Sequence, residues 1–412
     1  MQEENNKNNI TTITFGCRLN AVESEKIAKM VADIVPMAIV VNTCAVTGEA
    51  ERQSAQYVRR VARENPHIPI FITGCAATLD QSPFAKIPNV RVINNADKMN
   101  RNAYVDAIAG VDFSTDPEIH VSNPDTHMSK QFVQIQNGCN HDCTYCITRL
   151  LRGPSVSFEY DAILADVQNA VKNGYGEIVL TGVDSASYHK IYNNRPFLIS
   201  DLCRKLLKDV PEIRRLRLSS MDPASPEIFK IIDLMHENSR MMPHIHLSMQ
   251  SGSDTILQSM RRRHSAKMVR DIVAYANGIT FSWDIICGFP GETDELFDET
   301  MQMVTETHPI KIHAFPFSPR PGTPAATMPN QIPKNVSKQR VKRITDAATR
   351  NRKDFMNQHI GTRISVLVEQ NNVGRTQNDI SVIILGDSIP ERTICDCEIV
   401  GIDGDNFIAT VK

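Results

Sequence analysis

The chain has 412 residues, of which 41% are hydrophobic and 22% charged, and its formal net charge is −2. This length exceeds what one hydrophobic core usually supports, so we expect two or three domains, and the balanced composition excludes disordered and fibrous classes. The small net charge gives no overall field that would attract nucleic acid. Residues 1–10 are polar, and no apolar run approaches the roughly 20 residues that span a bilayer, so we expect a cytoplasmic protein without a membrane partner.

The first hundred residues alternate strand-like and helix-like segments. The predicted strands cover 11–15, 37–43, 68–73 and 91–94, and the predicted helices cover 22–34 and 49–65. This alternation is typical of a parallel sheet covered by helices. We therefore predict an α/β fold that begins with a doubly wound parallel sheet over residues 1–112. A polar segment with prolines at about 111–129 is expected to be a linker.

Repeated strand and helix patterns continue over residues 125–357. Six strand-like runs each end in a loop rich in Gly, Ser or Pro, at 132–136, 177–181, 215–219, 244–249, 283–287 and 312–317. Six such units predict a partial (β/α)6 barrel whose chemistry lies at the C-terminal ends of the strands. A basic helix at 337–357 follows. Short strands at 364–370, 380–385 and 397–402 then predict a small antiparallel β domain over 358–412.

The strongest chemical signal is QNGCNHDCTYC, which places Cys139, Cys143 and Cys146 in the loop after the first barrel strand. Three thiolates on one loop can bind three irons of a [4Fe–4S] cluster and leave the fourth iron open. S-adenosylmethionine bound there would be cleaved by one electron to a 5′-deoxyadenosyl radical. The alternatives are a zinc site with a remote fourth ligand and an incidental cysteine-rich turn, although structural zinc sites favour C-x2-C pairs.

A second group of cysteines is distant in sequence but similar in position. Cys17, Cys44 and Cys75 each follow a predicted strand. Because the carboxyl ends of parallel strands meet at one crevice, these thiols are expected to converge, and a second cluster with an open iron becomes plausible. Small apolar fillers at strand ends are the alternative. The remaining histidine and cysteine candidates are expected to be core or surface residues, not ligands: Cys203, Cys287, Cys395, Cys397, His244 and His246.

At this point the sequence resembles the methylthiotransferase family of radical S-adenosylmethionine enzymes, over essentially its whole length. TFGCRLN, VNTCAVT and ITGCAAT are similar to the family's N-terminal cluster motifs, and GCNHDCTYCITRLLRG is similar to its radical loop. LTGVD, RLRLSS, HLSMQSGSD, CGFPGET and FPFSPRPGTPAA resemble its later barrel motifs. The resemblance implies two [4Fe–4S] clusters and two uses of S-adenosylmethionine. One methylates a sulfur at the auxiliary cluster, and the other generates the radical that removes hydrogen from carbon 2 of an adenine.

The substrate branch rests on the segment FPFSPRPGTPAATMPNQIP, which most resembles the branch acting on threonylcarbamoyladenosine next to the tRNA anticodon. The implied partners are a tRNA anticodon stem-loop and an electron donor such as a flavodoxin or ferredoxin; the sulfur source is not indicated. The same chemistry on isopentenyladenosine of tRNA, or on an aspartate of a ribosomal protein, remains open. A nonenzymatic iron–sulfur RNA-binding protein is the alternative of a different class.

Residues 358–412 resemble the family's TRAM-like RNA-binding domain in a short form with few cations. Its aspartates include Asp379, Asp387, Asp396 and Asp403. The preceding basic helix is a second candidate for phosphate contacts, through Arg340, Lys342, Arg343 and Arg350. We expect the barrel to fold on its own core, so that deletion after about Asn357 weakens tRNA binding but leaves cofactor cleavage intact.

Contacts to the cofactor are predicted from position alone, and no catalytic residue is assigned. Thr181, Ser219, Gln250 and Gly288 each lie at or just after the end of a predicted barrel strand, where the ligand of such a barrel binds. Tyr145, inside the cysteine loop, is expected to lie along the adenine of the cofactor, with loop packing as the alternative role.

Overall fold

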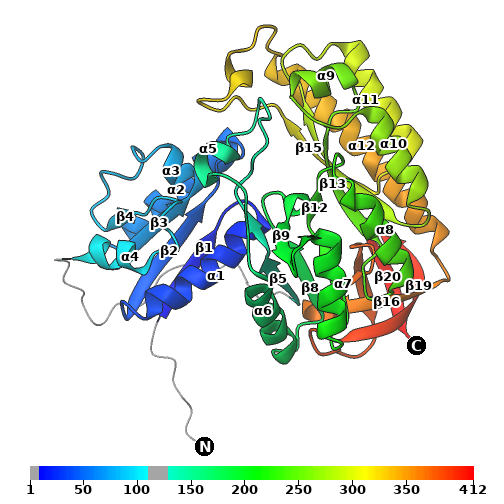
Figure 1. Cartoon of the computed structure of the whole chain (residues 1–412), viewed down its shortest axis with the longest axis horizontal. Helices are drawn as coiled ribbons and strands as arrows, with labels where there is room; N and C mark the ends of the chain where they lie inside the picture. Colours follow the sequence, from blue (N-terminus) through cyan, green and yellow to red (C-terminus); the bar gives the residue numbers. More distant parts are fainter. Residues whose placement is uncertain (1–8, 110–128) are drawn as a thin grey trace, which may run out of the picture.

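The computed structural model describes residues 9–109 and 129–412 (Figure 1). The first sheet contains β1 (Asn9–Thr14), β2 (Met37–Thr43), β3 (Ile70–Gly74) and β4 (Val90–Val92), all parallel and paired in that order. Its helices are α1 (Arg18–Ala32), α2 (Gly48–Glu64), α3 (Cys75–Leu79) and α4 (Arg101–Ile108). The expected boundaries at 112 and 125, and the linker apart from Ser129, lie outside the described residues.

Strand β2 explains why helices cover both faces of this sheet. Its sequence MAIVVNT is apolar at consecutive positions, so each face of the strand carries buried side chains. Ile39 packs on the same side as Val58 of α2, whereas Val40 packs on the other side with Ile27 of α1. The sheet is therefore held between layers, and the carboxyl ends of its strands share one edge.

The central part is a parallel sheet of six strands with a polar loop after each. The strands are β5 (Lys130–Gln134), β8 (Glu177–Thr181), β11 (Leu216–Leu218) with its continuation β12 (Ser220–Met221), β13 (His244–Gln250), β14 (Thr280–Cys287) and β15 (Lys311–Pro316). Hydrogen bonds give the orders β11-β8-β5 and β12-β13-β14-β15, joined through the interruption at Ser219. Within the described residues β5 and β15 form the two edges, as the prediction of a partial barrel requires.

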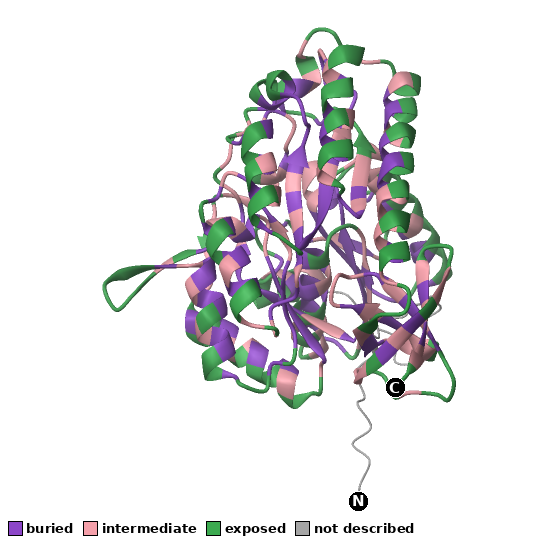
Figure 2. Cartoon of the chain, turned by 90° about the vertical axis from the view of Figure 1, so that its right-hand side faces the viewer, coloured by how far each residue is buried: buried purple, intermediate pink, exposed green. Residues whose placement is uncertain are grey.

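Helices and short elements complete this part of the chain. The helices are α5 (Thr148–Arg152), α6 (Tyr160–Lys172), α7 (Ile199–Asp209), α8 (Glu227–Glu237), α9 (Asp254–Ser259), α10 (Ala266–Tyr275), α11 (Asp294–Thr307) and α12 (Lys334–Gln358). The short strands are β6 (Gln136–Asn137), β7 (Val156–Ser157), β9 (His189–Tyr192) and β10 (Arg195–Leu198). Figure 2 shows buried positions along the strands and exposed positions on the outer helix faces. No helix in the described ranges is both long enough and apolar enough to cross a bilayer.

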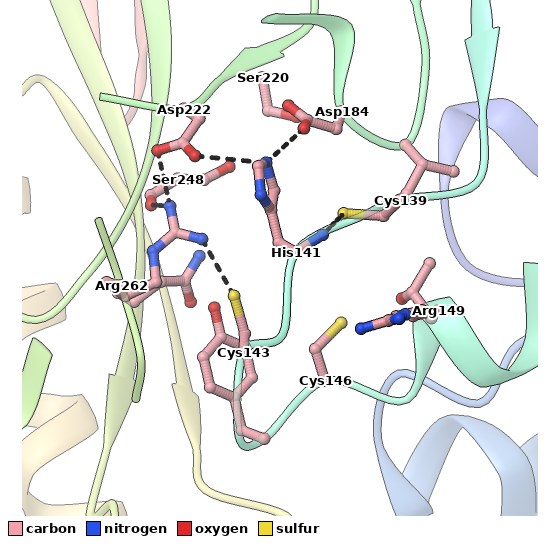
Figure 3. A pocket seen from close by; sticks show the side chains of 14 residues that line it. Cys139, His141, Cys143, Cys146, Arg149, Asp184, Ser220, Asp222, Ser248 and Arg262 are labelled. Atoms are coloured by element: carbon pink, nitrogen blue, oxygen red, sulfur yellow. Dashed lines mark hydrogen bonds and ion pairs between the residues drawn. The ribbon is translucent and has the colours of Figure 1, made fainter. Parts of the chain in front are cut away.

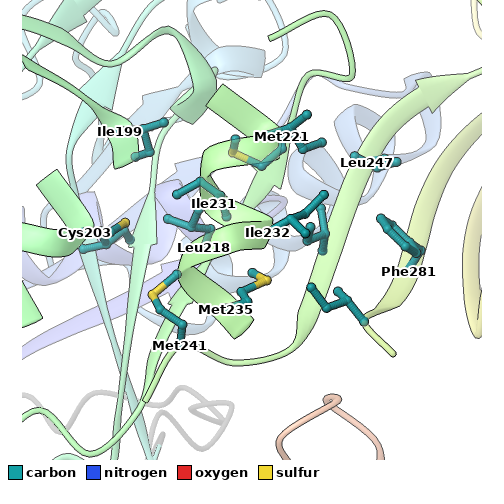
Figure 4. Packing of buried hydrophobic residues seen from close by; sticks show 14 of the residues in the cluster. Ile199, Cys203, Leu218, Met221, Ile231, Ile232, Met235, Met241, Leu247 and Phe281 are labelled. Carbon is teal, nitrogen blue, oxygen red and sulfur yellow. The ribbon is translucent and has the colours of Figure 1, made fainter. Parts of the chain in front are cut away.

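The main hydrophobic core lies between the strands and their outer helices (Figure 4). Leu218 of β11 packs in the same cluster as Ile231 of α8 and Cys203 of α7. Cys203 and Cys287 are both buried in this apolar cluster, so they serve as core residues.

Helix α1 of the first sheet packs directly against the central strands. Its Val22 forms a small buried cluster with Phe132 of β5 and Val179 of β8. The neighbouring positions Val133 and Leu180 belong instead to the main core on the other side. Since successive strand residues point to opposite faces, α1 covers the face of β5 and β8 opposite to that covered by the outer helices.

The C-terminal segment closes into a five-stranded barrel. Its strands are β16 (Arg363–Val368), β17 (Val373–Thr376), β18 (Ser381–Leu385), β19 (Ile394–Asp403) and β20 (Asn406–Val411), in the order β16-β17-β18-β20-β19. The pairs are antiparallel except for β18 and β20, which are parallel. Strands β17 and β20 were not predicted: β17 is short and contains Gly374, which weakens a strand pattern.

This small barrel docks on the starts of the central strands through buried charges. Arg215 donates to the carbonyl of Ser365 at 2.8 Å, and Arg217 donates to the carbonyl of Gln377 at 2.9 Å. Deletion of the C-terminal barrel would leave these buried guanidinium groups without their acceptors, which is costly. The expectation that the central barrel folds independently after truncation is therefore replaced by one of mutual support. Asp379 also points inward, to Lys130, rather than out to solvent.

Three of the basic residues of helix α12 are paired with acids that lie beside them. Arg340 is buried and binds Glu292 at 2.8 Å, so it is not available to a phosphate as the sequence suggested. Lys342 and Arg343 are ion-paired with Asp346 at 2.6 Å and Asp298 at 2.8 Å.

Candidate functional site

The loop with Cys139, Cys143 and Cys146 begins at a glycine that no other residue could replace. Gly138 has φ +69°, and a Cβ at this position would lie 1.9 Å from the carbonyl oxygen of Pro154. The next residue, Cys139, donates its backbone N–H to the carbonyl of Gly153 at 3.1 Å. The start of the loop is thus pinned against the chain that follows α5.

All three loop cysteines line one cavity at the C-terminal ends of the central strands (Figure 3). The Cys139 sulfur accepts a hydrogen bond from the backbone N–H of His141 at 3.4 Å. The Cys143 sulfur accepts one from Nη1 of Arg262 at 3.5 Å. Burial raises the pKa of Cys139 to about 11 and also raises that of Cys143, where the Arg262 charge opposes the effect. Metal binding would remove those protons, since thiolates are the ligands.

The opposite wall of the cavity carries carboxylates held by arginines. Asp222 accepts Nη2 of Arg262 at 3.0 Å and Nη2 of Arg263 at 2.8 Å, and Arg262 also donates to the Ser248 carbonyl at 2.9 Å. Although burial opposes it, the Arg262 charge and the Arg263 hydrogen bond lower the pKa of Asp222. Asp222 is therefore an ionised acceptor facing the cysteine loop.

His141 belongs to a second group of residues that could bind a metal ion at the same place. Its Nε2 lies 2.6 Å from Asp184 and 3.6 Å from Asp222. The ligand atoms of Cys139, His141 and Asp184 all lie within 4.8 Å of one another. A Cys, His and carboxylate set is a zinc-like combination. It shares Cys139 with the three-cysteine set, so metal content can separate the two.

Two of the predicted cofactor contacts line this cavity. Tyr145 is half-buried, and desolvation raises its pKa well above the ordinary value, so it is a neutral phenol. Gln250 ends β13 where the register with β14 shifts, and its φ is +73°. Positive φ at a residue other than glycine is uncommon and concentrates at functional sites.

The other three predicted contacts lie elsewhere. The Thr181 carbonyl accepts Ile135 N–H at 2.9 Å, and the Ser219 hydroxyl binds that of Ser185 at 2.9 Å. Gly288 faces α12: a Cβ there would lie 1.9 Å from the Ser337 hydroxyl. Near Thr181 and Ser219 the cavity wall is formed by residues one to three positions further on, in the turn after β8 and in and just after β12. Its contributors there include Val183, Asp184, Ser220 and Asp222.

These missed residues had weak signals in the sequence. Asp184 and Asp222 are the acids that follow strand patterns in LTGVD and SSMD, and Arg262 belongs to the run RRRH. A lone acid after a strand is common, so only the fold brings their roles together.

The other predicted cysteine group converges at the edge of the first sheet. Cys17 precedes α1, Cys44 follows β2, and Cys75 opens α3 directly after β3. Gly16 has φ +90°, and a Cβ there would lie 2.5 Å from the Cys44 sulfur. Burial raises the pKa of Cys44 to about 11, and the charges of Cys17 and Cys75 add to that effect. The three thiols are therefore neighbours in a cradle that only glycine leaves open.

Asn20 and Thr43 tie the cysteine-bearing loops together. The Asn20 amide donates to the carbonyls of Phe15 at 2.9 Å and Thr43 at 3.1 Å. The Thr43 hydroxyl donates to the Thr73 carbonyl at 2.7 Å and accepts the N–H of Ala77 at 3.0 Å. These bonds join the ends of β1, β2 and β3, so the thiol positions are fixed by the sheet.

A second cavity lies between the loop with Cys139, Cys143 and Cys146 and the segment that follows Cys44. Val46 and Thr47, just after Cys44, form one side, and Tyr145 to Thr148 of the other cysteine loop form another. The strand ends add apolar and polar side chains in equal number, with Gln250 shared between the two cavities: Gln250, Asp284, Ile286, Phe315, Pro316, Phe317, Ser318 and Arg320. Gly48 donates its N–H to the Ser318 hydroxyl at 3.2 Å, which holds the walls together.

His244 and His246 are satisfied inside the barrel, as the sequence favoured. His244 binds the hydroxyls of Thr280 at 2.8 Å and Ser282 at 2.9 Å, and burial lowers its pKa to about 3. His246 lies 2.9 Å from Asp284.

Two family models match separate parts of the chain. Residues 133–304 match the Radical SAM superfamily, and residues 9–94 match the uncharacterized protein family UPF0004. The first range contains the cysteine loop with its cavity, and the second contains the three cysteines of the first sheet.

Curated relatives match over nearly the full length. Threonylcarbamoyladenosine tRNA methylthiotransferase MtaB of Rickettsia prowazekii is 37% identical over 95% of this chain and 94% of the relative. The protein of the same name from Bacillus subtilis is 30% identical over 90% and 89%. A tRNA-2-methylthio-N(6)-dimethylallyladenosine synthase of Erythrobacter litoralis is also 30% identical, over 87% and 85%.

Solved structures show the same fold at low sequence identity. The radical S-adenosylmethionine methyltransferase TsrM of Kitasatospora setae, with cobalamin and a [4Fe–4S] cluster bound, has a TM-score of 0.54 and 13% identity, over 74% of this chain and 69% of that one. The cobalamin-dependent radical enzyme OxsB has a TM-score of 0.51 and 10% identity, over 85% and 57%.

Proposed function

Because the chain belongs to the radical S-adenosylmethionine methylthiotransferase family, we propose that it adds a methylthio group to carbon 2 of N6-threonylcarbamoyladenosine in tRNA, next to the anticodon. A [4Fe–4S] cluster and S-adenosylmethionine follow from the radical family; the second cluster is part of the proposal. Among relatives, those named for threonylcarbamoyladenosine include the one at 37% identity, and the ones named for dimethylallyladenosine stand near 30%.

The observation that carries the proposal is the second cavity, between the radical loop and the segment that follows Cys44. A reaction that needs a radical and a sulfur carrier requires both to reach one carbon atom of the substrate. Cys146 itself lines the cavity, and Val46 and Thr47, two and three residues after Cys44, line another side, so the cavity joins the radical loop to the segment that follows Cys44. Phe315 and Phe317 supply aromatic surface, which suits the flat face of a nucleobase.

The donor sets fit the clusters that the proposal requires. Cys139, Cys143 and Cys146 would hold the radical cluster, and Cys17, Cys44 and Cys75 the auxiliary one. The Gly16 cradle beside the Cys44 sulfur leaves room that any other side chain would occupy. When bound, the radical cluster supplies the electron that cleaves S-adenosylmethionine, and the auxiliary cluster holds the sulfur to be transferred.

The polar wall of the first cavity suits S-adenosylmethionine. Asp184 and Asp222 are carboxylates that can accept from the cofactor's ammonium and ribose hydroxyls, and Arg262 fixes Asp222 in place. Gln250 reaches both cavities, so it would stand between the cofactor and the nucleobase. Half-buried Tyr145 lines both cavities beside the cysteine loop.

The tRNA anticodon stem-loop would approach the mouth of the second cavity, and electrons would come from a flavodoxin- or ferredoxin-like donor. The C-terminal barrel remains a proposed RNA-binding element. It docks to the central barrel through charged hydrogen bonds, which would hold bound RNA near the cavity.

The test is to compare digested tRNA nucleosides from cells with and without this gene by mass spectrometry. We expect 2-methylthio-threonylcarbamoyladenosine to disappear and threonylcarbamoyladenosine to accumulate. Loss of methylthio from isopentenyladenosine, or from a ribosomal protein, would contradict the assigned substrate.

A further inference from the structure

Arg152 connects the two cysteine groups through a buried charged network. It ends α5, six residues after Cys146, yet its guanidinium reaches the first sheet. It donates to Glu23 of α1 at 2.8 Å and 3.1 Å and to the Asn20 side-chain oxygen at 2.6 Å. Lys98, from the loop before α4, binds the same Glu23 at 2.5 Å.

The network has more positive than negative charge. The side chains of Arg152, Lys98 and Glu23 are only 3%, 3% and 1% exposed, respectively. Two cations thus face one carboxylate away from water. Buried charge of this kind is expensive unless it is balanced, so the site favours an additional anion nearby.

Cys17, Cys44 and Cys75 lie beside this network, where an additional anion would be stabilised. The Asn20 side chain that accepts Arg152 also donates to the carbonyl of Thr43, the residue before Cys44. The Cys17 thiol lies 3.8 Å from the same Asn20 oxygen that accepts Arg152. On its other side Arg152 donates to the Asn137 side chain at 3.0 Å, two residues before Cys139. Its position is therefore fixed from both cysteine loops.

We propose that Arg152, supported by Lys98, is a positioning residue that sets the reduction potential of the auxiliary cluster and depends on the docked radical loop to do so. This inference rests on the auxiliary cluster of the proposed function. A reduced cluster carries one more negative charge than the oxidised one, so a fixed buried cation stabilises the reduced form and raises the potential. Glu23 has the opposite effect.

The charges allow a test with matched variants of opposite sign. In a Cys143→Ala background, which should retain only the auxiliary cluster, anaerobically reconstituted full-length protein would be titrated with dithionite and followed by electron paramagnetic resonance. Arg152→Gln should lower the auxiliary midpoint potential, and Glu23→Gln should raise it. Arg152→Lys, which keeps the charge but not the forked geometry, should lie between Arg152→Gln and the parent.

Each outcome decides a separate point. A mere loss of packing would not shift the potential in opposite directions in Arg152→Gln and Glu23→Gln, so the opposed shifts are the signature of the proposed role. Equal potentials in the parent, Arg152→Gln and Glu23→Gln would overturn the inference while leaving the auxiliary cluster intact. A parent that binds no cluster after Cys143→Ala would instead overturn the second cluster of the proposed function.

Discussion

The Lys130 ammonium lies 2.6 Å from the Asp379 carboxylate, which joins the first central strand to the C-terminal barrel. Behind this pair, the Glu177 carboxylate is fully buried. It lies 2.6 Å from the Arg217 guanidinium, 3.4 Å from the Lys130 ammonium and 3.7 Å from the Arg215 guanidinium. The Glu177 carboxylate therefore balances several cations at the starts of the central strands. The same group of charges joins the central barrel to the C-terminal barrel.

Removal of that carboxylate should destabilise the fold strongly. Glu177→Gln leaves buried cations without their main partner, and breaking a buried pair in this way costs about 3–5 kcal/mol. Urea unfolding can be followed by the fluorescence of Trp283, which is the single tryptophan and is fully buried. The matched control is Glu237→Gln, whose partner Arg204 is 46% exposed, with an expected cost below about 1 kcal/mol. Equal losses in the two variants would refute the buried network.

The same carboxylate predicts a pH dependence. Although burial opposes it, Arg217 and Lys130 hold the pKa of Glu177 at about 2, below its ordinary value near 4.5. A carboxyl whose pKa is lowered by folding contributes stability that is fully present above the unfolded pKa and lost as the pH falls through the folded pKa. The free energy of unfolding of the wild type should therefore fall from about pH 4.5 toward pH 2. Glu177→Gln should fall less steeply over that window, and parallel curves would contradict the assignment.

Metal content should distinguish the two candidate sets at the cysteine loop. If Cys139, Cys143 and Cys146 hold the radical cluster, His141→Ala should keep the full iron content after anaerobic reconstitution, because the imidazole is not a ligand. Cys139→Ala is the positive control and should lose about four irons. If His141→Ala loses as much metal as Cys139→Ala, the Cys139, His141 and Asp184 set is the true site.

Gly288 should matter for packing rather than for cofactor contact. In Gly288→Ala the new methyl group would lie 1.9 Å from the Ser337 hydroxyl and 3.3 Å from its Cα, so α12 would have to move. Gly278→Ala is the control: its φ is also positive, at +83°, but no atom lies within 4 Å of the new Cβ. The control should cost about 1 kcal/mol for backbone strain alone, and Gly288→Ala clearly more in thermal unfolding. Equal melting temperatures would exclude the clash.

The sequence predicted the layers well because the apolar patterns are strong. Residues 37–43 and 177–181 were expected as strands, and β2 and β8 span those ranges. The convergence of Cys17, Cys44 and Cys75 followed from strand order alone. The parallel arrangement puts the residue after each strand at one edge, whatever the side-chain details.

What sequence reasoning missed depends on contacts between distant segments. Arg152 looked like part of the radical motif, yet its charge acts on the other cysteine group. Arg340 looked like a phosphate contact, but Glu292 buries it in an ion pair. The motif RLRLSS contains Arg215 and Arg217, but nothing in the sequence shows that they reach Glu177 and the C-terminal barrel, so the charged joint appeared only in the fold. A run of charged residues in the sequence does not show which of those residues will form ion pairs in the fold.

The central claim is that the two cysteine groups do different jobs at one cavity, and reconstituted variants test it directly. Wild-type protein should bind about eight irons per chain and, with reductant, S-adenosylmethionine and an anticodon stem-loop bearing threonylcarbamoyladenosine, form 5′-deoxyadenosine and methylthiolated RNA. Cys143→Ala should form neither, because no electron reaches the cofactor. Cys44→Ala should still form 5′-deoxyadenosine but no methylthiolated product. A Cys44→Ala protein with full iron content and normal product would contradict the account, since Cys17, Cys44 and Cys75 would then be only buried thiols at strand ends.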